Sequence, residues 1–354
     1  MFVAWRDLRF AKGRFTLMGS VIVLITLLVG LLSGLTAGLA RENISAVTGL
    51  PADRIAFAAP PSGQSVSFTN STVTEKAWRE WAGRPGVTSA EPVGIRTLNA
   101  AAGDRTAAVS AFGVEADAGI APGRVGPGRA VLSAQAAEEL GTGAGETLRI
   151  GSRNVTVAEV AGDVSYSHTP VVWLALDDWQ ALGGGETATV IALRTGAGAD
   201  FAAGDKAAGT ETRTVDDALT AIGSYQAENG SLQLMRGFLF AISALVIGAF
   251  FTVWTIQRSA DIAVLKALGA ATPYLLKDAL GQAVLMLSAG TLLGTGLAAG
   301  IGVLVSGGNV PFVMEPLTVL VPAAVMIALG VLGAALSIRR ITAVDPLTAL
   351  GSAR

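Results

Sequence analysis

Few residues of this chain have side chains and spacing that could carry out chemistry. The 354 residues include no Cys and a single His, His168. Thiolate metal sites, cysteine nucleophiles and cages of several histidines are therefore excluded. His168 could pair with Asp163 and a serine as a hydrolytic triad, but a lone His in a predicted loop is more often a surface or packing residue.

The sequence also lacks the common nucleotide and hydrolase motifs. Residues 141–145 read GTGAG, but no Gly-Lys-Ser/Thr follows, so no P-loop can surround a phosphate there. No Gly-x-Ser-x-Gly nucleophile elbow occurs. We therefore expect a chain that is not itself an enzyme.

An ionisable pair follows a row of glycines near the N-terminus. Gly30, Gly34 and Gly38 stand at four-residue steps, and Glu42, preceded by Arg41, takes the next step. On a helix these positions share one side. Small residues at this spacing let another helix approach closely, or they leave a groove for a flat apolar ring. The charged pair is either an interfacial anchor or part of a binding site.

Composition places these residues in a membrane protein with a sizeable water-exposed part. The chain is 51% hydrophobic and 15% charged, against about 25% charged in soluble domains. This balance argues against an ordinary cytosolic enzyme, a disordered chain and a nucleic-acid-binding protein. A bilayer-spanning helix needs about 20 apolar residues. Four runs meet that length, at residues 16–40, 232–256, 279–305 and 317–338.

Positive charges flank these runs on one side. They are Arg6, Arg9, Lys12 and Arg14, then Arg258, Lys266 and Lys277, then Arg339, Arg340 and Arg354. Loop 306–316 has no Lys or Arg. The positive-inside rule therefore predicts a multi-pass protein of the cell membrane with both termini cytoplasmic and residues 41–230 outside. A cleaved signal peptide is disfavoured because the first run exceeds the usual 7–15 residues.

We expect three regions. Residues 1–40 form a cytoplasmic helix and the first span, 41–230 an extracytoplasmic domain, and 231–354 the last three spans. The middle region carries 14 Lys and Arg against 22 Asp and Glu, and its pattern is that of an α/β domain. Expected strands are 54–59, 65–70, 107–114, 130–133, 147–150, 155–160, 170–174 and 188–193. Expected helices are 74–82, 134–140, 176–182 and 214–230, with a loop at 196–209.

Between the second and third spans lies a short amphipathic segment. Ser259 can cap a helix, Gly269 can end it, and Thr272-Pro273 can start the next one. We expect a helix of about 259–270 at the inner membrane face. Its residues for docking a cytoplasmic partner are Ile262, Leu265, Lys266 and Leu268. The alternative is plain contact with interfacial lipid.

Three segments resemble ABC transporter permeases of the MacB/FtsX type. DIAVLKALGA at 261–270 is similar to that family's coupling helix, WRDLRFAKGRFTL at 5–17 to its amphipathic N-terminus, and IRRITAVDPLTAL at 338–350 to its last motif. The resemblance implies four transmembrane helices, one plus three, with an inserted α/β extracytoplasmic domain. It also implies a homodimer in membrane lipid, driven mechanically by a separate ATPase subunit that binds ATP, with no nucleic acid.

The size of the outer segment and the short 306–316 loop are most similar to the haem-exporting permeases of this family. Haem is then the expected transported substrate, with no intrinsic cofactor. A carboxylate can ligate ferric iron and an arginine can pair with a propionate. The expected haem-binding residues are Glu42, as the possible iron ligand, with Arg41, Gly34, Gly38, Met235 and Glu228.

Further candidate ligands are Tyr225, Met314 and Glu315, and His168 ranks below Glu42. Two other functions stay open. One is export of another amphiphile such as a peptide, antibiotic or lipid. The other is a non-transporting signalling permease that controls an outer partner.

Overall fold

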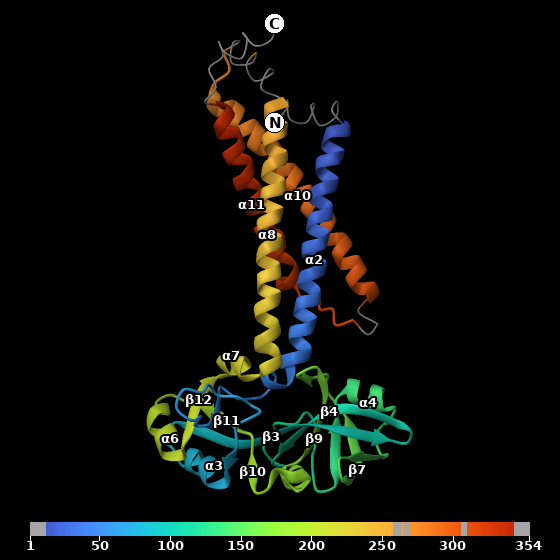
Figure 1. The fold of residues 1–354 in the computed structure, drawn as a ribbon, viewed down its shortest axis with the longest axis vertical. Helices are drawn as coiled ribbons and strands as arrows, with labels where there is room; N and C mark the ends of the chain where they lie inside the picture. Colours follow the sequence, from blue (N-terminus) through green and yellow to red (C-terminus); the bar gives the residue numbers. More distant parts are fainter. Residues whose placement is uncertain (1–11, 258–263, 265–268, 306–309, 343–354) are drawn as a thin grey trace. The chain divides into compact units, whose positions relative to one another are not determined.

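The computed structural model describes residues 12–257, 264, 269–305 and 310–342. The chain divides into two compact units, Leu39–Gly230 and the residues on either side of it. Helices α2 (Lys12–Thr48) and α8 (Gly223–Gln257) contribute residues to both units. Leu39–Gly230 is here called the outer unit, and the unit formed by the residues before and after it is called the membrane unit (Figure 1).

Four helices of the described part are long and apolar enough to cross a membrane. They are α2, α8, α10 (Thr272–Val305) and α11 (Pro316–Thr342). Even α11, with 27 residues, is about 40 Å long at 1.5 Å per residue, more than the ~30 Å hydrocarbon core. These helices confirm the expected one-plus-three arrangement.

The membrane unit packs through small residues and leaves large ones facing outward. A Cβ added at Gly30 of α2 would lie 2.7 Å from the Cβ of Ala298 on α10, so the two backbones approach closely there. Leu287 and Phe251 are fully buried in the core between the helices, whereas Leu245 and Leu304 are exposed. Such an inside-and-outside distribution suits a bundle surrounded by lipid.

The outer unit is built on a ten-stranded sheet. Neighbouring strands follow the order β12, β1, β11, β3, β4, β9, β5, β7, β6, and β6 pairs again with β3. Six strands therefore close into a ring, in the order β3, β4, β9, β5, β7 and β6. The other three, β11, β1 and β12, extend the sheet from β3. The strands are β1 (Arg54–Ala58), β3 (Val87–Ala102), β4 (Arg105–Val114), β5 (Arg129–Leu132), β6 (Thr147–Ile150), β7 (Arg153–Val160), β9 (Thr169–Ala175), β11 (Val190–Thr195) and β12 (Thr210–Thr214). Short strands β2 (Val73–Thr74) and β10 (Thr187–Ala188) pair with each other, and β8 (Ser165–Tyr166) pairs with β9.

Two hydrophobic cores lie on opposite faces of this sheet, as the alternation along β1 shows. Ala56 belongs to one core, and its neighbours Ile55 and Phe57 belong to the other. The first core is covered by α3 (Glu75–Ala82), α4 (Ala134–Leu140), α5 (Leu176–Trp179) and α6 (Phe201–Ala208). The second is covered by the end of α2 and by α7 (Val215–Ala218).

Local signals predicted α4 correctly from end to end. Ser133 caps it, because its Oγ accepts a hydrogen bond from the Ala136 N–H at 3.3 Å. Gly141 ends it with a left-handed φ of 61°, the conformation that glycine adopts without a Cβ penalty. Strands β1, β4, β5, β6, β7 and β9 are likewise found close to their predicted positions.

Two predictions for the outer unit are wrong. Residues 65–70 form no strand. Their alternation buries one side chain, Phe68, whose ring packs edge-on against Phe57 at 4.8 Å. Residues 196–209 were expected as a loop but contain α6, capped by Asp200. Its small residues serve close packing, since a Cβ at Gly204 would lie 2.8 Å from Cζ2 of Trp81.

Other segments differ from the prediction in extent. The 16-residue strand β3 was not predicted at all. The expected helix 176–182 continues from α5 into a π-helical turn, Gln180–Gly184. The expected helix 214–230 is broken at Ile222, whose extended backbone separates α7 and a 3₁₀ turn from α8.

Candidate functional site

A tight turn between β8 and β9 presents the only histidine to two helices. Ser167 and His168 form this turn with φ of 50° and 61°, the only positive-φ residues other than glycine among those described. The left-handed conformation costs an L-residue about 1 kcal/mol. Backbone hydrogen bonds hold the turn beside α2, from His168 N–H to Glu42 O at 3.2 Å and from Ser167 N–H to Asn43 O at 3.0 Å.

The His168 ring lies between two carboxylates. Its Nε2 is 2.9 Å from Oε2 of Glu228, on the first turns of α8. Its Nδ1 is 3.5 Å from Oε2 of Glu42, on α2. A neutral ring that carries its proton on Nε2 can donate a hydrogen bond to Glu228 but none to Glu42, whereas an imidazolium can donate to both carboxylates. The three side chains are 29–42% exposed, so these charges are partly hydrated and contribute little stability.

Asn43 connects the cluster to the interior. It is 1% exposed, and its Nδ2 donates to Glu228 Oε2 at 3.2 Å. Ser224 Oγ donates to Asn43 Oδ1 at 2.7 Å, and Ser167 Oγ lies 2.8 Å from Ser224 Oγ. Residues from α2, α8 and the turn thus form one network within the outer unit. Its hydrogen bonds hold the Glu228 carboxylate, and the Glu42 carboxylate approaches it through His168 Nδ1.

The side chains of this cluster do not point toward a common position where they could bind one ion. Glu42 and Glu228 face opposite nitrogens of the His168 ring, and no group of three acidic, His or Cys residues in the described ranges could hold a metal ion. What the geometry offers is single ligands: a carboxylate or an imidazole that could take one axial position on an iron already held by another molecule.

The predicted residues on α2 divide between the two units. Arg41 is exposed and Glu42 half-buried in the outer unit. Gly34 and Gly38 lie in the membrane unit, where residues 310–315 cover them. A Cβ at Gly34 would be 2.7 Å from the ring of Phe312, and one at Gly38 would be 2.7 Å from the Phe312 nitrogen. In this conformation the expected groove is therefore filled by the chain itself.

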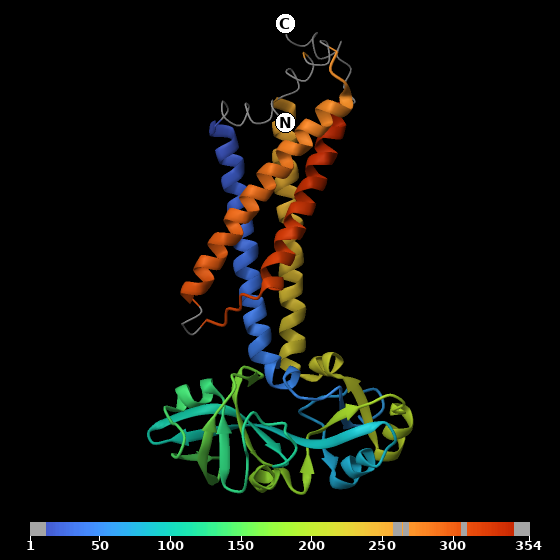
Figure 2. The same ribbon diagram turned by 180° about the vertical axis from the view of Figure 1, so that it is seen from behind.

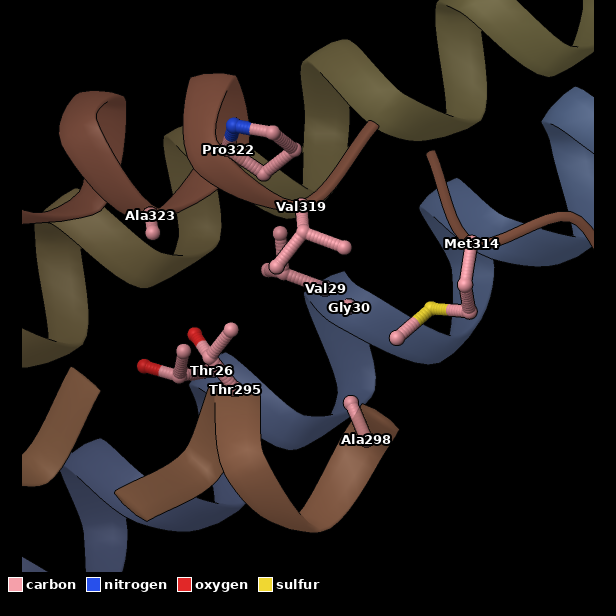
Figure 3. Close-up of a pocket in the computed structure, with 9 residues that line it drawn as sticks. All are labelled: Thr26, Val29, Gly30, Thr295, Ala298, Met314, Val319, Pro322 and Ala323. Atoms are coloured by element: carbon pink, nitrogen blue, oxygen red, sulfur yellow. The ribbon is translucent and has the colours of Figure 1, made fainter. Parts of the chain in front are cut away.

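The remaining candidates are scattered. Met235 on α8 is 49% exposed, Glu315 is exposed, and Tyr225 packs against the second core of the outer unit. Met314 lines a pocket between α2, α10 and α11 (Figure 3). The predicted docking residues Ile262, Leu265, Lys266 and Leu268 lie outside the described residues.

Sequence reasoning ranked His168 low and missed Asn43. It treated His168 as a separate candidate ranked below Glu42, and the structure brings the two side chains together. No local signal announces this contact, since Ser-His lacks the Gly, Asn or Asp usual in such turns. Asn43 is a buried polar residue in the last turns of α2, and it could have been singled out only with the end of that helix already known.

The comparisons with known proteins cover nearly the whole chain. Residues 18–210 match the family described as the MacB-like periplasmic core domain, and residues 234–346 match the FtsX-like permease C-terminal family. A putative hemin transport system permease protein HrtB of Staphylococcus epidermidis is 26% identical over 99% of both chains. An uncharacterised ABC transporter permease of Mycobacterium tuberculosis is 24% identical over 99% of both.

Among solved structures, the periplasmic region of MacB from Actinobacillus actinomycetemcomitans is similar with a TM-score of 0.36 and 11% identity, over 50% of this chain and 95% of that one. The two family matches establish the family of this chain. One of them spans more than half of the chain, and together they leave only short segments unmatched. The chain belongs to the ABC transporter permeases of the MacB/FtsX type.

Proposed function

We propose that this chain is the permease subunit of an ATP-driven efflux pump that removes haem from the outer half of the membrane. An ABC permease is the membrane subunit of a transporter, and its ATPase is a separate partner. The carrying observation is the full-length similarity to a protein named as a hemin transport permease. Glu42 adds to it, because its half-buried carboxylate lies beside the His168 ring at 3.5 Å and a carboxylate can serve as a ligand of ferric iron.

In the proposed site Glu42 ligates the iron and the adjacent Arg41 pairs with a propionate. Glu228, Met235, Gly34 and Gly38 are proposed as further contacts of the macrocycle. Two copies of the chain are proposed to place their α2 helices face to face, so that one haem meets Glu42 of both in a two-fold arrangement.

The proposed mechanism is mechanical. The ATPase docks on residues 259–270 from the cytoplasm, and its closure tilts the helices. Since α2 and α8 each contribute to both units, their tilt reaches the turn that carries His168. Transport then proceeds by a change of shape around the outer leaflet, with the termini inside and residues 41–230 outside.

The visible spectrum of the purified permease–ATPase complex with added haemin tests the proposal. We expect a saturable Soret shift at one haem per dimer. Glu42→Ala should weaken binding and alter the Soret band without affecting ATPase assembly. Glu139→Gln, which changes an exposed acid on α4, is the matched control and should change neither.

Three outcomes contradict this reading. A Glu42→Ala variant with unchanged spectrum and affinity, together with loss of both in His168→Ala, would assign the iron ligand to His168. No Soret shift, with peptide or lipid stimulating ATP hydrolysis, would identify another amphiphile as the substrate. No shift with a soluble protein bound to residues 41–230 would identify a signalling permease.

A further inference from the structure

Residues 310–315, here called the strap, cross α2 inside the membrane unit. They directly precede α11 and have no regular secondary structure. Figure 2 shows the strap as the thin red-orange segment that passes over the blue helix α2. A backbone hydrogen bond from Val313 N–H to Gly34 O, 3.1 Å long, holds it there.

The strap inserts one aromatic ring between two glycines. The ring of Phe312 lies against Gly34 of α2 and against Gly302 of α10. A Cβ at Gly34 would be 2.7 Å from the ring carbons Cε1 and Cε2, and one at Gly302 would be 3.1 Å from Cδ1. The distance at Gly34 is shorter than real Cβ contacts, and the distance at Gly302 is tighter than most of them. The slot therefore fits a flat ring and excludes any side chain on its walls.

A small cavity adjoins the strap. Met314 lines it together with Thr26, Gly30 and Ala298 (Figure 3). Only about 10 Å³ of it admits the centre of a water molecule. A site of that size holds one water at most. With the strap seated, the cavity is closed to any larger guest.

A polar group in this cavity has no partner. Thr26 is 2% exposed, and within the described part of the chain its Oγ1 has no hydrogen-bond partner. A helical threonine usually bonds the carbonyl four residues earlier, as Thr36 does with Leu32 at 2.7 Å. A buried hydroxyl without a hydrogen-bond partner destabilises the structure around it. The cavity therefore contains an unused donor beside the aromatic slot.

We propose that Phe312 controls access to this face of α2, because its ring occupies the place that a flat substrate ring would take. The strap leaves when the substrate ring enters the slot. Met314 moves away with the strap, and its departure opens the cavity that contains the Thr26 hydroxyl. The inference rests on the proposed function for the identity of the ring. It makes the slot selective for planar macrocycles over bulky, non-planar amphiphiles.

Cysteine labelling tests the strap without relying on haem. The chain contains no Cys, so Met314→Cys reports strap position through its rate of reaction with a small maleimide in the purified complex. Phe312→Ala should raise that rate at least tenfold without ligand. Protoporphyrin IX, which is planar and lacks iron, should raise it in the parent chain. Val310→Ala, a strap residue that is 46% exposed, is the control and should leave the rate unchanged.

Binding separates this inference from the proposed function. Phe312→Ala should bind haemin about tenfold more tightly, because no ring must be displaced, and Phe312→Trp should bind it more weakly. If both variants bind haemin with parent affinity and label at the parent rate, the strap proposal fails while haem transport stands. If Phe312→Ala frees the strap but no variant binds haemin or protoporphyrin, the strap stands and the haem proposal fails.

Discussion

The carboxylate of Glu228 lies 2.9 Å from Nε2 of His168, although 60 residues separate the two in sequence. The contact joins the start of α8 to the turn between β8 and β9, and the same ring faces Glu42 of α2. One side chain thereby connects the two helices that enter the outer unit. The turn accepts an unfavourable backbone conformation to make this contact.

Substitutions at His168 should separate its side chain from its backbone. His168→Ala loses the contacts and retains the left-handed strain, whereas His168→Gly loses the contacts and relieves the strain. We expect His168→Gly to be more stable than His168→Ala by about 1 kcal/mol. Thermal unfolding of the full chain in detergent measures the difference. Equal stability of the two variants would contradict the strained turn.

Gly204 should not tolerate a side chain. Gly204→Val places atoms inside the ring of Trp81, which is fully buried, and overpacking of this kind costs about 1–3 kcal/mol. Ala202→Val, on the exposed side of α6, adds a similar side chain and should cost less than about 1 kcal/mol. Tryptophan fluorescence during denaturant unfolding reads both, and similar losses in the two variants would contradict the close packing.

Acid residues of the outer unit should give its stability a pH dependence. Burial raises the pKa of Glu115 above its ordinary value of 4.5, and nearby Asp177 raises it further. Burial, followed by the charge of Glu115, also raises the pKa of Glu91. Groups of this kind bind protons more tightly when folded, so their contribution is present at low pH and is lost as pH rises through the folded pKa.

Thermal unfolding between pH 4.5 and 7.5 checks the sign. Glu115→Gln should raise the melting temperature at pH 7.5 and flatten its pH dependence. Glu146→Gln is the opposite case, since hydrogen bonds from the Gly143 N–H and Thr142 hydroxyl lower the pKa of Glu146. It should lower stability at neutral pH, where that contribution is present. A stabilising effect of both variants at pH 7.5 would contradict these assignments.

The predicted docking helix can be tested by one charge. Leu265→Glu should abolish ATPase association in a pull-down, because a carboxylate in an apolar interface stays unpaired and desolvated. Ala263→Ser, off the predicted apolar stripe, should leave association intact. Full association of Leu265→Glu would reject residues 259–270 as the docking segment.

The predicted topology is tested by single cysteines. Ser62→Cys should react with an impermeant maleimide on intact cells, and Ser259→Cys should react only after the membrane is made permeable. The absence of native Cys gives no background. Labelling of both positions from outside would reverse the orientation assigned by the positive-inside rule.

Sequence reasoning found the parts of the fold that are specified locally. The four apolar helices follow from run length, and α4 follows from Ser133 and Gly141 at its ends. It missed β3, whose Pro, Gly and Asn residues are poor strand formers; pairing with β4 along ten residues and with β11 holds it in place.

Only part of the candidate site could be predicted from the sequence. Glu42 could be singled out because it takes the next four-residue step after Gly30, Gly34 and Gly38. Its contact with His168 depends on the register of β8 and β9. The filling of the Gly34 groove depends on Phe312, which is 278 residues further along the chain. Long-range packing of this kind leaves no periodicity to read.

The long strand β3 has a consequence for how the outer unit is made. Its first half pairs with β11, which is synthesised about 100 residues later. At roughly 5–20 residues per second, the ribosome needs about 5–20 s to supply that partner. During this interval α2 is already complete, and the edge of β3 has no neighbour on that side. Translation speed across residues 103–195, or a chaperone that shields an open edge, should therefore decide the yield of folded permease.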